Sequence, residues 1–457
     1  MIRQTVPFII YNANPYDLLI CEIMADPDPV VLLPEAEYIE IYNSTEYDLD
    51  LSDWTISAGS TQRTIDFGLI ESEGYMVICD DGDVYLFEDE LNVVAVDGFP
   101  SLTNGGATLT LKDDEGNVIH TITYSDTWYN DNFKADGGYS LEMIDLNNPC
   151  EGALNWTASE DISGGTPSAE NSVIGDNPDI ISPYPVAAEV IAPDTVVVYF
   201  SETMQEDFAN NTDNFEVSQF GNPSWISAAE PDFATITMKF DGEFETGTVY
   251  YLNITYSVRD CIGNLVVENT SIRFGIADSV QTGDLVINEI LFNPLSGGSD
   301  FVELYNNSDR LVDLKKLWLV SLDELGEVKY SYQMTEISRL LLPGEFCAVS
   351  EDIQFLKDNY YIMYPDNLYE IDDVPSMPDD EGTIIVSDRY QNYIDEVYYT
   401  DDQHYKLLAS DDGVSLERIN YDTPSDEESN WHSAAQDAGF ATPGYVNSQY
   451  SSEIVSE

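Results

Sequence analysis

Basic residues are scarce in this sequence. Its 457 residues include 16 Lys and Arg against 86 Asp and Glu, which gives a formal charge of −70 at pH 7. Such a surface repels nucleic acid and anionic membranes, so we expect neither as a partner. Salt that screens the charge, or divalent cations that neutralise part of it, would make the excess tolerable, which favours an extracellular or saline setting.

Cysteine, histidine and long apolar runs are scarce as well. Five Cys are too few for a disulfide framework in a chain of this length, and Cys21, Cys79 and Cys347 lie in apolar runs that predict buried thiols. None of the three His lies in a metal-binding or nucleophile-activating motif, and a glycosidase-like pair of acids is expected by chance among 86, so we expect no enzymatic activity. No stretch could span a membrane, and the N-terminus lacks a signal-peptide core, which leaves a removed signal or another export route open.

One stretch of the chain is written twice. Ile20 to Ser57 contains "ICEIMADP", "EYIEIYN" and "DLSDWTIS", and Ile287 to Ser321 contains "INEILFNP", "DFVELYN" and "VDLKKLWLVS". The copies also end alike, with "NWTAS" and "GGTPSAENS" in the first and "NWHSA" and "FATPGYVNS" in the second. Two copies of one domain are therefore predicted. The alignment pairs Glu22 with Glu289, Pro27 with Pro294, Glu40 with Glu303, Tyr42 with Tyr305, Asn43 with Asn306 and Trp54 with Trp318.

Short alternating runs separated by Asp, Gly and Asn turns predict β-sandwiches throughout. The expected fold class is all-β, with three immunoglobulin-like β-sandwich domains in tandem. The Pro-rich stretch "VIGDNPDIISPYP" predicts a linker after the first of them. The predicted bounds are an N-terminal extension at 1–17, the first copy at 18–176, a shorter middle domain at 177–280, the second copy at 281–450 and a tail at 451–457.

The two copies resemble the lamin tail domain, through the "INEI…NP" opening, the "ELYN" strand, the "DL…W" turn and the "NW…TPG…NS" ending. The first copy departs from this pattern with Cys21 at the Asn288 position and Ser168 at the Gly444 position. The middle segment resembles a bacterial Ig-like domain of the S-layer type, through "VVVYFSETM" and "YYLNITYSVRDCIGN". The arrangement is similar to exported surface proteins of Bacteroidetes. The resemblance implies a surface or secreted scaffold and offers no catalytic residues to carry over.

Carboxylates of the first copy are the candidate metal ligands. Alternation places Glu22 on one strand face with Ile20 and Met24, and if its strand pairs with that of Glu40, two carboxylates approach each other without a counter-charge. Residues 18–176 contain 33 Asp or Glu and only three basic residues, which motivates the hypothesis of bound calcium. The alternative is that the glutamates accept hydrogen bonds from backbone or Tyr groups and that the loop acids are solvated. The candidate ligands are Glu22, Glu40, Asp26, Asp28, Asp80, Asp81 and Asp83.

The loop "DCIGN" of the middle segment contains a further acid. Asp260 and Asn264 are residues that hydrogen-bond the local backbone, and Gly263 permits a positive φ, so turn chemistry explains the loop. Calcium at this loop is a secondary hypothesis.

Aromatic side chains are the candidate contacts for a ligand or partner. Four Trp occupy matched positions in the two copies and are expected in the cores: Trp54, Trp156, Trp318 and Trp431. Aromatic residues without such a counterpart could stack on sugar rings or contact a protein. These are Trp128, Trp225, Tyr360, Tyr361 and Tyr364.

The sequence thus predicts a non-enzymatic extracellular or cell-surface scaffold of structural or adhesive function, assembling into a filament or layer or binding bivalently through its two copies. The expected partners are further copies, other surface proteins or a surface glycan, and calcium is the one cofactor considered. One alternative is a module of a larger secreted enzyme or adhesin that binds a surface polysaccharide or a protein. Another is an intracellular scaffold of a halophile.

Overall fold

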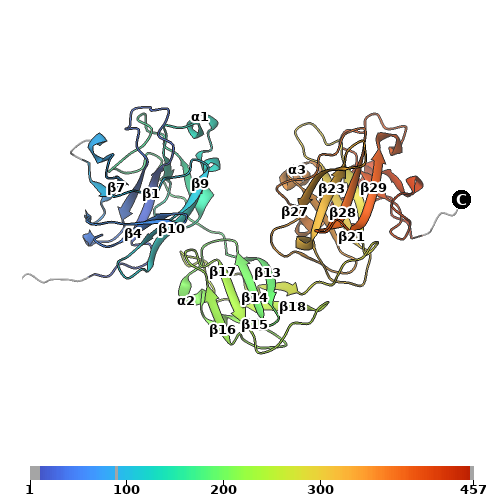
Figure 1. The fold of residues 1–457 in the computed structure, drawn as a ribbon, viewed down its shortest axis with the longest axis horizontal. Helices are drawn as coiled ribbons and strands as arrows, with labels where there is room; N and C mark the ends of the chain where they lie inside the picture. Colours follow the sequence, from blue (N-terminus) through green and yellow to red (C-terminus); the bar gives the residue numbers. More distant parts are fainter. Residues whose placement is uncertain (1–10, 88–90, 453–457) are drawn as a thin grey trace, which may run out of the picture.

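The computed structural model describes residues 11–87 and 91–452. Its sheets form three successive all-β sandwich domains, and no sheet takes strands from two of them. In Figure 1 the first and last sandwiches lie on either side of the middle one, which is drawn in green and yellow. Within the described ranges, no helix has the length and apolarity needed to cross a membrane.

The first sandwich packs a six-stranded sheet against a four-stranded one around a core of Ile, Leu and Trp side chains. The six-stranded sheet has the order β12 (Trp156–Ala158), β11 (Leu141–Met143), β1 (Leu18–Met24), β2 (Tyr38–Asn43), β7 (Tyr75–Asp80) and β8 (Val93–Val96). The four-stranded sheet has the order β10 (Val118–Ser125), β9 (Gly106–Lys112), β4 (Thr55–Ala58) and β5 (Thr61–Thr64). A short pair, β3 (Leu49–Asp50) and β6 (Leu69–Ile70), and helix α1 (Asn132–Ala135) complete it.

The last sandwich repeats this strand order. Its six-stranded sheet contains β31 (Trp431–Ser433), β30 (Leu416–Arg418), β20 (Leu285–Leu291), β21 (Phe301–Asn306), β26 (Phe346–Ser350) and β27 (Leu368–Glu370). Its four-stranded sheet contains β29 (Tyr393–Thr400), β28 (Glu381–Asp388), β23 (Leu317–Leu322) and β24 (Val328–Gln333). The short pair is β22 (Val312–Asp313) with β25 (Leu340–Leu341), and helix α3 (Ile353–Asn359) precedes β27.

The middle sandwich is smaller and has a different topology. One sheet has the order β13 (Pro185–Ala192), β14 (Thr195–Phe200), β17 (Thr235–Lys239) and β16 (Trp225–Ala228), and the other β15 (Phe215–Val217), β18 (Val249–Ile254) and β19 (Ser271–Gly275). Helix α2 (Glu206–Ala209) follows β14. Its core includes edge-to-face contacts of Phe244 with Tyr250 and Phe274, at ring-centroid distances of 5.1 Å each.

A β-bulge at the same place in both copies corrects the predicted strand faces. The register between β1 and β2 shifts between Ile20 and Glu22, so Ile20 packs in the main core while Glu22 lies on the outer face with Met24 and Tyr38. The prediction that Ile20 shares the face of Glu22 is wrong, because the extra residue reverses the alternation. β20 shifts likewise between Ile287 and Glu289.

The Trp alignment is also corrected by one residue. The carbonyl of Trp54 accepts the N–H of Ile65 at 2.8 Å, and the equivalent bond in the last sandwich joins Met334 N–H to the carbonyl of Leu317 at 3.0 Å. Leu317 therefore occupies the core position of Trp54, and Trp318 is half-buried. The predicted core positions of Trp54, Trp156 and Trp431 are confirmed, as are the buried thiols of Cys21, Cys79 and Cys347.

The remaining two cysteines form a disulfide that was not predicted. Cys150 lies beyond β11 of the first sandwich, and Cys261 lies in the loop after β18 of the middle one. Their Cα atoms are 6.5 Å apart and 111 residues apart in sequence. The bond therefore links two domains, which the spacing of five cysteines alone does not reveal.

Candidate functional sites

The first and last sandwiches each contain a row of three buried glutamates, placed by three neighbouring strands. In the first copy Glu22 of β1 lies opposite Glu40 of β2 on one side and Glu142 of β11 on the other. In the last sandwich the same positions hold Glu289 of β20, with Glu303 of β21 and Glu417 of β30 beside it. All six side chains are fully buried. The predicted approach of Glu22 and Glu40 is therefore confirmed, and a third carboxyl extends it.

The closing segment of the first copy, residues 164–172, crosses its glutamate row and donates to all three members. Thr166 donates its N–H to Glu22 at 2.9 Å and its hydroxyl to Glu142 at 3.0 Å, and Ser168 donates its N–H to Glu40. Ser168 has a φ of 63°, which directs this N–H toward the row. Buried carboxyls need such donors because desolvation is otherwise uncompensated.

The closing segment of the last sandwich, residues 440–448, makes the equivalent bonds. Thr442 donates its N–H to Glu289 and its hydroxyl to Glu417, each at 2.8 Å, and Gly444 donates its N–H to Glu303. Gly444 has a φ of 85°, in the same left-handed region as Ser168. The first copy thus has Ser at the position of Gly444 and keeps the same left-handed backbone conformation there.

Burial raises the pKa values of Glu22, Glu40, Glu289, Glu303 and Glu417. It raises the pKa of Glu22 to about 7, and burial together with the charge of Glu417 raises that of Glu289 to about 8. Burial and the facing glutamate raise the pKa of Glu40 and of Glu303 well above the ordinary value. These groups accordingly retain protons into the neutral range and act as hydrogen-bonded structural groups. Tyr38 also donates to Glu22 at 2.7 Å, as the alternative to metal binding anticipated.

The loop acids predicted as calcium ligands lie apart from one another. Asp80 accepts the N–H groups of Gly82 at 2.9 Å and Phe99 at 3.1 Å, and Asp26 accepts from the Asn104 amide at 2.6 Å. Among the described residues, none of the seven predicted ligands belongs to a cluster of three or more His, Cys, Asp or Glu whose ligand atoms could share one ion. The remaining predicted acids are Asp28, Asp81 and Asp83, of which the first two are exposed and the third half-buried.

The predicted aromatic contacts differ in exposure. Trp225 is 52% exposed on β16, and Tyr361 and Tyr364 are 62% and 54% exposed. Trp128 is half-buried against Trp156, with ring centroids 6.2 Å apart. Tyr360 is buried and donates its hydroxyl to the carbonyl of Gly413 at 3.2 Å, so it offers no surface contact.

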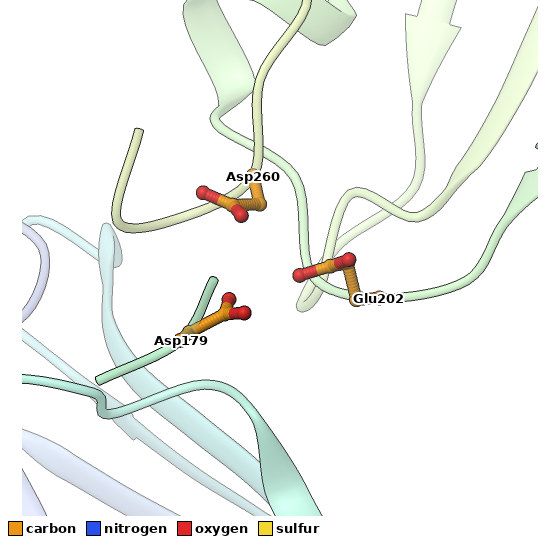
Figure 2. A group of neighbouring side chains, drawn as sticks. All are labelled: Asp179, Glu202 and Asp260. Atoms are coloured by element: carbon orange, nitrogen blue, oxygen red, sulfur yellow. The ribbon is translucent and has the colours of Figure 1, made fainter. Parts of the chain in front are cut away.

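One acidic cluster does bring three carboxylates together, at the boundary of the first and middle sandwiches. We call Asp179, Glu202 and Asp260 the acidic junction. Asp179 lies in the linker before β13, Glu202 directly follows β14, and Asp260 lies in the loop after β18, next to the disulfide at Cys261. One oxygen of each lies within 4.8 Å of those of the others. Figure 2 shows the three side chains directed toward one another.

Hydrogen bonds fix one oxygen of each Asp and leave the other unpaired. Oδ1 of Asp260 accepts the N–H groups of Ile262, Gly263 and Asn264 at 3.0, 2.7 and 2.8 Å, as turn chemistry predicts for "DCIGN". Oδ1 of Asp179 accepts the N–H of Ile181 at 2.8 Å. Oδ2 of Asp260 and Oδ2 of Asp179 are buried without a hydrogen-bond partner.

The electrostatics of the acidic junction reflect burial and mutual repulsion. Burial, followed by the charges of Asp260 and Asp179, raises the pKa of Glu202 to about 8. Burial also raises the pKa of Asp260. No Lys or Arg forms an ion pair with any of the three within residues 11–87 and 91–452. Asp260 was identified in the sequence through its loop motif. Asp179 and Glu202 were missed because they lie in separate segments that no motif or regular spacing connects.

A cleft of about 790 Å³ lies between the middle and last sandwiches. The cleft is lined by Glu189 of the middle sandwich and by Ala277, which follows β19. It is also lined by Lys315, Trp318 and Tyr390 of the last sandwich. The half-buried Trp318 therefore faces a cleft of mixed charge and aromatic character.

Two family models match parts of the chain. A model described as Lamin Tail Domain matches residues 12–126, and a model described as Bacterial Ig-like domain matches residues 175–275. Each covers less than half of the chain, and residues 276–457 lie outside both. No curated protein matches the chain.

Solved structures show only distant likeness. The N-terminal part of the bacterial S-layer protein SbsC is 16% identical, with 37% of this chain and 41% of that chain covered and a TM-score of 0.20. A DUF4876 family protein from Bacteroides thetaiotaomicron is 14% identical, covering 49% and 85%, with a TM-score of 0.21. SGBP-B of the Bacteroides ovatus mixed-linkage glucan utilization locus, in complex with a heptasaccharide, is 8% identical, covering 81% and 64%, with a TM-score of 0.19. The chain spans about two fifths of the SbsC structure, and at these scores no functional argument follows.

Proposed function

We propose that this protein is a non-enzymatic structural scaffold of the bacterial cell surface or extracellular space. The observation that carries the proposal is the pair of built junctions, which hold two sandwiches of identical topology on either side of an Ig-like domain. A scaffold that bears load or spaces binding surfaces needs defined angles between its modules, whereas flexibly linked domains do not keep them.

The junction between the first and middle sandwiches is covalent. The disulfide of Cys150 with Cys261 is reinforced by a salt bridge of Lys112 with Glu230. Disulfides persist in oxidising compartments and are rare in the cytosol, so this pairing favours the extracellular location over the halophile alternative.

The junction between the middle and last sandwiches combines ion pairs with apolar contact. Lys315 pairs with Glu189 at 2.7 Å, and Arg273 pairs with Glu345 at 2.6 Å. Ala277, Leu311 and Leu340 form a small buried cluster between them. Partly buried ion pairs with apolar support hold orientation better than exposed ones, which contribute little.

The last sandwich is assigned here to the same family as the first. Its strand order, its bulge, its row of three glutamates and the bonds of its closing segment all repeat those of the sandwich that the Lamin Tail Domain model matches. The residues that form these shared features are therefore equivalent in the first and last sandwiches, even where the two sequences differ.

The proposal includes no enzymatic role because the Glu and His side chains that could take part in catalysis make structural hydrogen bonds instead. The six buried glutamates accept hydrogen bonds within the sandwiches, and the ring of His120 is bonded through both nitrogens, to Ile20 N–H and to the carbonyl of Pro149. His404 contacts the Ser433 hydroxyl at 2.9 Å. Side chains that make such structural hydrogen bonds are less available for catalysis.

Edge strands offer a route to assembly into a filament or layer. β5 and β24 end the four-stranded sheets of the two copies at equivalent positions, and every residue of β5 is exposed. β24 exposes Val328 and Tyr330 along an unpaired edge. Such edges pair readily with another chain unless they are protected.

Assembly is tested by light scattering and electron microscopy of the purified chain over a range of concentrations, with and without calcium. Filaments, sheets or reversible oligomers are expected, and Tyr330→Lys should weaken them because a charge on an edge strand opposes pairing. Tyr405→Lys, at an exposed site outside β5 and β24, is the matched control. A monodisperse monomer at all concentrations and conditions would contradict the assembling scaffold.

A second candidate is a module that binds a surface glycan, and one observation favours it. Trp225 is a large aromatic residue exposed on an edge strand, where nothing in its own domain requires it. A glycan array followed by calorimetry on Trp225→Ala and Trp128→Ala tests this function. Binding lost in Trp225→Ala but kept in Tyr405→Ala supports it, and an array without hits removes it.

A further inference from the structure

We propose that the acidic junction is a divalent-cation site, of the calcium class, that fastens the interdomain linker to the middle sandwich. The inference does not depend on the scaffold function, since it concerns the chemistry of Asp179, Glu202 and Asp260 alone.

Geometry is the first argument. The three carboxylates come from three segments that are distant in sequence, yet they place one oxygen each within 4.8 Å of the others. Oxygens held about 2.4 Å from one Ca²⁺ ion lie no more than about 4.8 Å from one another, so the three carboxylates are close enough to share an ion. Figure 2 shows the three side chains directed toward one another.

The unpaired oxygens are the second, independent argument. Asp260 is fully buried and Asp179 is 7% exposed, and the Oδ2 atom of each is buried without a hydrogen-bond donor. A buried carboxylate oxygen without a partner is costly, and three like charges without a basic residue add to that cost. A bound cation removes both costs together.

The ligand set selects the kind of cation. All three donors are carboxylate oxygens, which hard cations prefer, whereas zinc and copper sites use His or Cys. Mg²⁺ keeps several of its waters and is usually bound through one or two carboxylates, so a set of three protein carboxylates suits it less well. Three acidic ligands, each free to bind through one or two oxygens, match the flexible coordination of Ca²⁺.

The position of the site gives it a structural consequence. Asp179 belongs to the segment that leads from the first sandwich into β13, while Asp260 precedes the cysteine that is bonded to the first sandwich. The amide of Asn264 also donates to the carbonyl of Asp179 at 3.3 Å. A cation here would fix the linker against the same loop that the disulfide holds, so the angle between the two sandwiches would depend on calcium.

Calorimetric titration of the full chain with CaCl₂ in 0.15 M NaCl, after chelator treatment, tests the proposal. One saturable site per chain with a Kd below about 1 mM is expected, the range of extracellular calcium modules, with weaker binding of MgCl₂. The variants Asp260→Asn, Asp179→Asn and Glu202→Gln should each weaken calcium binding about tenfold or more, because each removes one charged ligand. Asp81→Asn, an exposed acid of the first copy, is the control and should bind like the parent.

A thermal melt supplies a second readout that a merely structural role would not give. In chelator the three variants should melt at or above the parent temperature, because each relieves repulsion, and Asp260→Asn keeps the Oδ1 acceptor for its loop. With calcium the order should reverse, since only the parent gains stability by mass action. Small-angle scattering should show a narrower distribution of shapes for the calcium-bound parent. Calcium binding that is absent, or equally strong in the three variants and the control, would overturn the proposal.

Discussion

The first and last sandwiches have the same glutamate row, but different side chains donate hydrogen bonds to it. At the bulge, the last sandwich has Asn288, whose amide donates to Glu303 and to Asn447 at 2.7 Å each. The first copy has Cys21 there, and its thiol donates to a backbone carbonyl instead. Oε1 of Glu40 is consequently left without a partner. The closing segment is therefore the constant element of this fold, and the bulge residue is the variable one.

A second difference concerns the acceptor for the N–H just before the bulge. In the first copy the N–H of Ile20 donates to Nδ1 of His120 at 2.8 Å, and in the last sandwich the N–H of Ile287 donates to Asp395 at 2.7 Å. Asp395 is half-buried, and Arg418 pairs with it at 3.1 Å. The first copy has the neutral Met143 at the Arg418 position and needs no counter-charge. The same strand N–H is therefore bound by a neutral histidine in the first copy and by an ion-paired aspartate in the last sandwich.

The largest effect is expected from removing the ionic partner. Arg418→Met copies the first sandwich at this position but removes the ionic partner of Asp395, which keeps only its hydrogen bonds from Ile287 and Ser425. The loss of this pair should destabilise the last sandwich by about 3–5 kcal/mol. Chemical denaturation of the full chain, followed by the Trp431 signal, measures the loss. The double variant Arg418→Met with Asp395→His copies both residues of the first sandwich and should recover part of it. Equal losses in the single and double variants would contradict the neutral-for-ionic exchange.

The next largest effect should be a difference between the two copies in how the free energy of unfolding depends on pH. Burial raises the pKa of Glu22 to about 7 and of Glu289 to about 8, so the folded state holds protons that the unfolded chain releases above about 4.5. This stabilisation is complete below pH 4.5 and is lost as the pH rises through 7 to 8, by at most about 1.4 kcal/mol per pH unit for each group. Glu289→Gln should flatten the slope of the last sandwich, as measured by denaturation from pH 5 to 9. An unchanged dependence of stability on pH would show that the glutamate row ionises without destabilising the fold.

His120 gives the first copy a slope of opposite sign. Burial lowers its pKa to about 4, so unfolding takes up a proton between about pH 4 and the ordinary value of 6.5. Stability contributed by this ring is present above pH 6.5 and is lost as the pH falls toward 4. The contributions of Glu22 and His120 should therefore oppose each other between about pH 4.5 and 6.5. Burial also lowers the pKa of His404, so the last sandwich has an acid-side loss of its own.

A smaller effect is expected from exchanging the bulge residue of the last sandwich. Asn288→Cys removes the amide that bonds Glu303 and Asn447 and should cost about 1–3 kcal/mol, the penalty for leaving buried polar atoms unpaired. The measurement is the denaturation midpoint of the last sandwich, with Asn307→Ser, an Asn of the same domain outside the row, as control. A loss no greater than that of the control would remove Asn288 from the network.

The sequence predicted the strands, the repeat and the meeting of Glu22 with Glu40, because alternation and duplicated motifs are local patterns. It placed Ile20 on the wrong face because one extra residue in a strand leaves no signature in composition. The Cys150–Cys261 bond and the acidic junction were missed for another reason. Both join segments that become neighbours only when the first and middle sandwiches dock, and such long-range placement is not encoded in any spacing.

The smallest effect should be a gain, from giving the first copy the bulge residue of the last. Cys21→Asn places an amide beside two atoms that have no partner there, Oε1 of Glu40 and Oδ1 of Asn171. Asn171 already holds the position of Asn447, since its amide donates to the carbonyl of residue 21 at 2.9 Å as that of Asn447 does to residue 288 at 2.8 Å. Each new bond contributes about 1 kcal/mol, so the denaturation midpoint of the first sandwich should rise. Cys21→Ser, which is too short to reach Glu40, should give no gain, and a fall with Asn would mean that the two copies differ in more than this side chain.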